Sequence, residues 1–136
     1  MAHILVIDDD PVLRRVITLA LEAAGHTVLR CENGRKAVDF LAHDHTDLLI
    51  TDIIMPEMDG VETVRAARRL APSLPILAIS GGGSFAPDDY LGMARAFGAT
   101  DVLPKPFHPP DLVARVAQLL AGPVREDGGQ DTVKEC

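Results

Sequence analysis

Short apolar runs alternate along this chain with longer segments in which apolar residues recur every three or four positions. Apolar runs rich in branched side chains are typical of strands buried on both faces of a parallel sheet. The longer periodic segments predict amphipathic helices that cover such a sheet. The predicted strands are His3–Ile7, Thr27–Cys31, Leu48–Thr51, Pro75–Ile79 and Asp101–Leu103.

Proline, glycine and asparagine residues mark where the predicted helices begin and end. The expected helices begin at Pro11, at Asn33-Gly34, after Gly60, near Pro87 and at Pro109-Pro110, and they end at Gly25, before the third strand, after Ala71, at Phe97 and at Gly122-Pro123. Strands that alternate with helices in this way predict an α/β fold whose sheet is covered on both faces.

The most economical arrangement of these elements is a doubly wound, five-stranded parallel sheet of the flavodoxin-like type, in the order 2-1-3-4-5. Pro104 follows the last strand, and proline cannot donate to a strand ladder, so this strand belongs at an edge of the sheet. We expect one domain over residues 1–122, followed by a polar tail over residues 123–136 with little order.

Composition and charge exclude several classes of protein. The chain has 136 residues, a net charge of -7 and a pI near 5.0, whereas a protein that binds nucleic acid directly needs a basic face. We find no apolar run of about 18 residues and no signal peptide pattern, so we expect a cytoplasmic protein with no membrane partner. Two cysteines do not make a disulfide framework.

Polar residues that could carry chemistry follow four of the predicted strands. Asp8 and Asp9 follow the first strand, Asp52 the third, Ser80 the fourth and Lys105 the fifth. In open α/β sheets ligands bind at the carboxyl ends of the strands, so these residues should surround one small volume. Neighbouring carboxylates repel one another by roughly 1 to 4 kcal/mol per pair, which favours a bound cation. Oxygen ligands suit Mg²⁺, and a carboxylate can also be the nucleophile that forms an aspartyl phosphate.

These residues, together with their flanking segments, resemble a known family. Asp8-Asp9, the run from Asp52 to Gly60, Ser80 and Lys105-Pro106-Phe107 are similar to the motifs of the receiver domains of two-component response regulators. The resemblance covers about residues 3 to 121. It implies a stand-alone, CheY-like receiver that acts as a phosphoacceptor and is not an enzyme with a separate substrate.

The resemblance implies a route for the phosphoryl group. Asp52 would accept it from a histidine kinase or a histidine phosphotransfer protein, and the signal would leave through contacts with a downstream protein. Ser80 would form a hydrogen bond to the phosphoryl group and Lys105 would pair with it. The Lys105–Pro106 peptide bond is expected to be cis.

The resemblance also implies a set of ligands for Mg²⁺. Asp9, Asp52 and the backbone carbonyl of Ile54 would bind the ion directly, and Asp8 would bind it through a water molecule. We assign no ligand role to the neighbouring Asp10.

Basic residues lie on two predicted helices. We expect Arg65, Arg68 and Arg69 to form a solvated face near the end of the third helix, where cations suit the helix dipole. By the resemblance, Arg14 and Arg15, with His108, would face the kinase.

Three other interpretations are open. Asp8 and Asp10 match the nucleophile motif of a haloacid-dehalogenase-like phosphatase, but the later acidic pair Asp88-Asp89 precedes Lys105, whereas that family needs such a pair after the lysine. A glycine pattern over residues 81–86 resembles a dinucleotide-binding fingerprint, yet it follows the fourth strand and that fingerprint belongs to the first βα turn. A third possibility is a pseudo-receiver, a binding module that has kept the fold and lost the chemistry.

Overall fold

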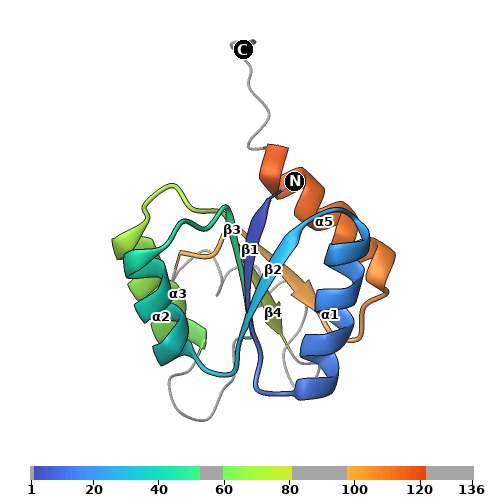
Figure 1. The fold of residues 1–136 in the computed structure, drawn as a ribbon, viewed down its shortest axis with the longest axis horizontal. Helices are drawn as coiled ribbons and strands as arrows, with labels where there is room; N and C mark the ends of the chain where they lie inside the picture. The colour runs from blue at the N-terminus through green and yellow to red at the C-terminus, as the bar shows by residue number, and fades with distance from the viewer. Residues whose placement is uncertain (1, 53–59, 81–97, 122–136) are drawn as a thin grey trace.

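The computed structural model describes residues 2–52, 60–80 and 98–121 (Figure 1). The strands are β1 (His3–Ile7), β2 (Thr27–Cys31), β3 (Leu48–Asp52), β4 (Ile76–Ser80) and β5 (Asp101–Pro104). The helices are α1 (Pro11–Ala23), α2 (Gly34–His43), α3 (Gly60–Leu70) and α5 (Pro109–Ala121). The expected helix near residues 87–97, the carbonyl of Ile54 and the expected polar tail lie outside the described residues.

The predicted sheet is confirmed, because all its strands run parallel in the order β2-β1-β3-β4-β5. α1 and α5 cover one face, and α2 and α3 cover the other (Figure 1). Successive side chains of β1 alternate between the two cores, with Ile4 and Val6 on the α1 side and Leu5 and Ile7 on the α2 side. Every residue of β3 is buried, so this central strand delivers its last residue, Asp52, from a fixed position.

Two element boundaries have simple chemical causes. Asp10 caps α1, since its carboxylate accepts hydrogen bonds from the backbone of Val12 and Leu13. β4 begins at Ile76, one residue later than predicted, because Pro75 has no N–H to donate to the ladder; its carbonyl still accepts from the backbone of Leu49.

The expected solvated arginine face is right for Arg65 and Arg69 and wrong for Arg68. The Arg68 guanidinium is partly buried and donates hydrogen bonds to three main-chain carbonyls, those of Pro72, Leu74 and Gly98, at 2.7 to 3.1 Å. Burial lowers the pKa of this side chain. Arg68 therefore ties the end of α3 to the segments that lead into β4 and β5.

None of the helices in the described ranges has the length and apolar character needed to cross a membrane. Cys31 ends β2 as a free, half-buried thiol.

Candidate functional site

The register of the sheet brings the ends of four strands together. Ile7 of β1 lies opposite Thr51 of β3, so the next residues along these strands, Asp8 and Asp52, are also neighbours. Asp52 in turn pairs with Ile79 of β4. Because parallel strands end at the same edge, residues far apart in the sequence meet in one place.

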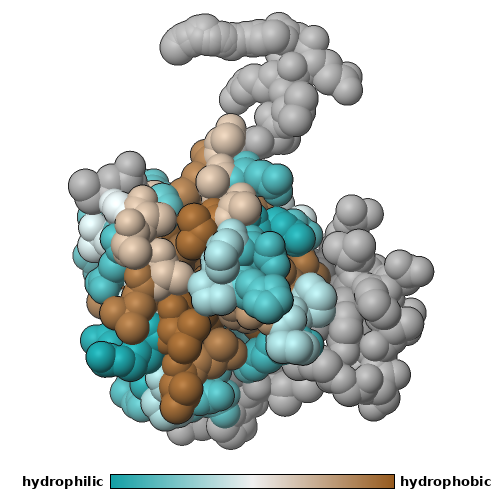
Figure 2. All heavy atoms as spheres, turned by 90° about the vertical axis from the view of Figure 1, so that its right-hand side faces the viewer, coloured by the Kyte–Doolittle hydropathy of each residue, from teal (hydrophilic) through white to brown (hydrophobic). Residues whose placement is uncertain are grey.

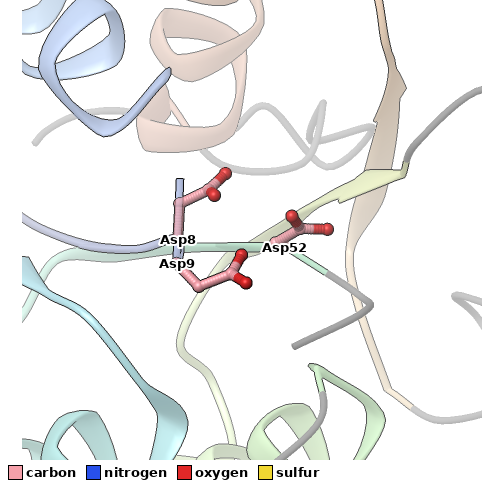
Figure 3. Close-up of side chains that lie close together, drawn as sticks. All are labelled: Asp8, Asp9 and Asp52. Atoms are coloured by element: carbon pink, nitrogen blue, oxygen red, sulfur yellow. The ribbon is translucent and has the colours of Figure 1, made fainter. Parts of the chain in front are cut away.

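Three carboxylates converge at this edge (Figure 3). One oxygen from each of Asp8, Asp9 and Asp52 lies within 4.8 Å of the other two. Asp8 and Asp52 are buried, with 1% and 6% of their surface exposed, whereas Asp9 is exposed. The cluster is therefore closed on the protein side and open to solvent at Asp9.

Lys105 completes the charge arrangement. Its Nζ atom lies 3.1 Å from Oδ2 of Asp52 and 4.0 Å from Oδ2 of Asp8, and about a quarter of its side chain is exposed (27%). The Lys105–Pro106 peptide bond is cis, as the resemblance implied. Among the described residues, Lys105 faces two of the three clustered carboxylates, so negative charge is in excess in this part of the site.

The pKa of Asp8 reflects this environment. Burial is the largest influence and raises the pKa from its ordinary value of 3.8 to about 6, with smaller upward contributions from the charges of Asp52 and Asp9. A hydrogen bond from the backbone of Asp10 and the charge of Lys105 oppose the rise. Without a bound metal ion, Asp8 is therefore mostly protonated below about pH 6.

The donor set fits Mg²⁺. Oδ2 of Asp8 is buried and has no hydrogen-bond partner among the described residues, although a buried carboxylate oxygen normally has one. All the side-chain ligand atoms of the cluster are carboxylate oxygens, which suit hard cations such as Mg²⁺. A divalent cation at this edge would satisfy the orphaned oxygen and relieve the repulsion among the carboxylates.

Main-chain contacts hold the acidic cluster in place. Arg14 of α1 donates from Nη1 to the carbonyl of Asp8 at 2.7 Å, and the backbone N–H of Asp8 donates to the carbonyl of Cys31 at 3.3 Å. On β3, the hydroxyl of Thr51 donates to the carbonyl of Asp52 at 2.9 Å. These contacts cannot be predicted from the sequence, because every residue has a main-chain carbonyl.

The predicted site residues therefore divide into three groups. Asp8, Asp9, Asp52 and Lys105 lie together. Ser80 ends β4, in register with Pro104, which places its backbone at the same edge. Ile54 lies outside the described residues. Asp10 serves as the cap of α1 and is not among the clustered carboxylates.

Residues 4–117 match the family model of the response regulator receiver domain. The chain belongs to this family. Among curated relatives, the receiver domain is 41% identical over 120 residues to the response regulator receiver protein CpdR of Brucella abortus, covering 88% of this chain and 98% of that protein. It is 36% identical over 130 residues to the response regulator MprA of Mycolicibacterium vanbaalenii. That match covers 96% of this chain but 55% of MprA, so the chain spans about half the length of this relative.

Solved structures show the same fold. A response regulator from Chloroflexus aurantiacus aligns with the receiver domain at a TM-score of 0.81 and 33% identity, covering 88% of this chain and 98% of that one. The chemotaxis response regulator CheY4 of Vibrio cholerae aligns at a TM-score of 0.77 and 31% identity, with the same coverage of both chains. The predicted family and fold class are thus confirmed.

Proposed function

We propose that this receiver domain accepts a phosphoryl group on Asp52 in a Mg²⁺-dependent reaction and signals through contacts with other proteins. The observation that carries the proposal is the convergence of three carboxylates and Lys105 at the carboxyl edge of the sheet. Asp52 is the buried carboxylate that the central strand presents there, and it lies within reach of both the acidic pair and the lysine. We propose the phosphohistidine of a kinase or phosphotransfer protein as the donor.

The proposed roles follow from charge and position. Asp9 and Asp52 would hold Mg²⁺ directly, together with the Ile54 carbonyl, and Asp8 would act through water. When bound, the cation would neutralise charge on the transferred group, which is the main requirement of phosphoryl transfer. Lys105, already 3.1 Å from Asp52, would pair with a phosphoryl oxygen. Ser80 would donate a hydrogen bond to the same group, a role that rests on its place at the end of β4.

The three alternative interpretations lose support. The haloacid-dehalogenase interpretation required Asp10 as a working acid, but Asp10 uses its carboxylate to cap α1. The dinucleotide-binding interpretation has no support from the family match over residues 4–117. A pseudo-receiver would have lost a residue of the constellation, whereas Asp9, Asp52, Ser80 and Lys105 are all present. We therefore propose a phosphoacceptor that assists its own phosphorylation and does not turn over a separate substrate.

Incubation with acetyl phosphate tests the proposal. With Mg²⁺, the intact mass of the wild-type chain should rise by one phosphoryl group, and that of Asp52→Asn should not change. Asp39→Asn is a matched control, since Asp39 is an exposed carboxylate on α2, and it should be labelled like the wild type. Equal labelling of Asp52→Asn and wild type would contradict the assignment of Asp52 as the phosphoacceptor.

The outer face of α1 suggests where the phosphodonor docks. Val12, Val16 and Leu19 recur at helical spacing and are 38% to 71% exposed, and Figure 2 shows apolar side chains gathered over this side of the molecule. Arg15 and His108 are exposed, as a docking residue must be. Arg14 is half-buried and holds the carbonyl of Asp8, so its substitution would disturb the site itself.

We expect Arg15→Glu to slow transfer from a histidine kinase shown to phosphorylate the wild-type chain, by about tenfold, because rim charges steer association. Labelling by acetyl phosphate should not change. Arg35→Glu, an equal change of charge at an exposed position of α2, is the control and should transfer at the wild-type rate. Parallel losses in the two variants would place the docking surface elsewhere.

A further inference from the structure

A second charged site lies at the same edge of the sheet, beyond β1 on the side away from β3. It is an open hollow with a volume of about 390 Å³, lined by Arg14, Arg30, Cys31, Glu32 and Lys36. The three cations come from α1, β2 and α2, so the fold brings them together from separate segments. Such a concentration of positive charge runs against the balance of a chain whose net charge is -7.

The charges of this basic hollow do not cancel. Nζ of Lys36 lies 2.6 Å from a carboxylate oxygen of Glu32, which is the one acid among the lining residues. Within the described ranges, neither Arg14 nor Arg30 forms an ion pair. Three cations and one carboxylate give the lining residues a net positive charge.

The Arg14 side chain is fixed by one hydrogen bond to the main chain. Its Nη1 atom donates to the carbonyl of Asp8 at 2.7 Å, which fixes the side chain while leaving further N–H donors of the guanidinium for other partners. Arginine presents these donors in a planar fork that matches the oxygens of phosphate, often two at a time. Burial raises the pKa of the Cys31 thiol while Lys36 and Arg14 lower it, so both cations act on the interior of the hollow.

We propose that the basic hollow binds a compact polyanion that carries phosphate, of the phosphate-ester or diphosphate class. Its negative charge complements the net positive charge of the lining, and the volume accommodates a small ligand. The hollow adjoins the acidic cluster, because Arg14 contacts the carbonyl of Asp8, but β1 separates β2 from β3, the strand of Asp52, by about 10 Å. A ligand bound there could not be attacked by Asp52, so it is a separate binding event.

Titration of the full chain with inorganic diphosphate tests this proposal. EDTA and the omission of divalent cations keep the acidic cluster negative, so the probe is repelled from the phosphoacceptor site. Backbone amide shifts should show one saturable site, with the largest changes at residues 14 and 30–36. Acetate at matched ionic strength should produce no saturable change, because a monoanion cannot neutralise the hollow.

Two variants decide whether the hollow is the site. Arg30→Ala should weaken diphosphate binding at least tenfold, whereas Arg35→Ala, which removes the same charge from an exposed position outside the hollow, should weaken it less than twofold. Both residues are exposed, so unchanged melting temperatures would show that each variant folds. The proposal is overturned if diphosphate does not saturate, or if the two variants lose affinity equally.

Discussion

Lys105 and Arg68 are partly buried cations at opposite ends of the strands of the same sheet, and their partners differ in kind. Lys105, past the carboxyl end of β5, faces the carboxylates of Asp52 and Asp8. Arg68 lies near the amino ends of β4 and β5. Within the described residues, its hydrogen-bond acceptors are all main-chain carbonyls. From the sequence, Lys105 is predicted to lie with the strand-end carboxylates, whereas Arg68 is predicted to belong to a solvated face.

The contacts of Arg68 are therefore permanent, whereas those of Lys105 can be exchanged. The carbonyls around Arg68 carry no net charge and are fixed by the fold, so nothing in the chemistry of the protein releases them. The carboxylates around Lys105 can instead bind a proton, a metal ion or a phosphoryl group, each of which changes the balance of charge. Removal of Arg68 should therefore affect stability, and removal of Lys105 should affect chemistry.

The largest effect on stability is expected at Arg68. Arg68→Ala removes the hydrogen bonds from a charged donor to the carbonyls of Pro72, Leu74 and Gly98, and should lower the free energy of unfolding by about 4 kcal/mol. Urea denaturation measures this loss, with the exposed Arg65→Ala as the matched control, expected within about 0.5 kcal/mol of wild type. Mg²⁺ should not restore the lost stability. A loss no larger than that of the control would mean that the hydrogen bonds of Arg68 do not stabilise the fold.

Lys105→Ala should show the opposite pattern. Phosphorylation by acetyl phosphate should slow by about 10² to 10³-fold, the usual effect of removing one donor to developing charge. Any loss of stability comes from unrelieved repulsion among the carboxylates, so Mg²⁺ should largely restore it. Labelling at the wild-type rate would remove Lys105 from the chemistry, and a stability loss that Mg²⁺ leaves unchanged would make it a structural residue like Arg68.

The raised pKa of Asp8 predicts a smaller effect on the free energy of unfolding, and this effect depends on pH. Because burial raises its pKa from 3.8 to about 6, the metal-free folded chain binds more protons than the unfolded chain between these values. The contribution of Asp8 to stability is therefore present below about pH 4 and is lost as the pH rises through 6, by up to about 3 kcal/mol.

The free energy of unfolding in EDTA, measured from pH 4 to 7 for wild type and Asp8→Asn, isolates this contribution. The advantage of wild type over Asp8→Asn should shrink across the range, and Mg²⁺ should reverse the trend near pH 7, where the carboxylate is free to bind the ion. Curves that stay parallel over the whole range would contradict the raised pKa.

Much of the carboxyl edge could be predicted from the sequence. Buried parallel strands leave continuous apolar runs, so their ends are visible, and the rules of sheet order then place Asp8, Asp9 and Asp52 side by side. The predicted bounds of β1 and β2 agree with the structure residue by residue. The late start of β4 was also within reach, because Pro75 cannot donate to the ladder.

The partners of the arginines could not be predicted in the same way. Arg68 binds the carbonyl of a glycine 30 residues along the chain, and Arg14 binds that of Asp8. Every residue has a carbonyl, so the sequence does not mark which one an arginine will reach. An arginine on a predicted helix therefore defaults to a solvated face, and only the packing of the helices against the sheet reveals exceptions such as Arg14, Arg68 and Arg115, which donates to the carbonyl of Val102.

The central claim is that Asp52, and no other carboxylate at this edge, takes the phosphoryl group. Reduction with borohydride converts an aspartyl phosphate to homoserine, so peptide mass spectrometry after treatment with acetyl phosphate and Mg²⁺ locates the modified residue directly. The account predicts homoserine at position 52 alone, and none when Mg²⁺ is replaced by EDTA. Homoserine at position 8 or 9, or equal modification without Mg²⁺, would contradict it.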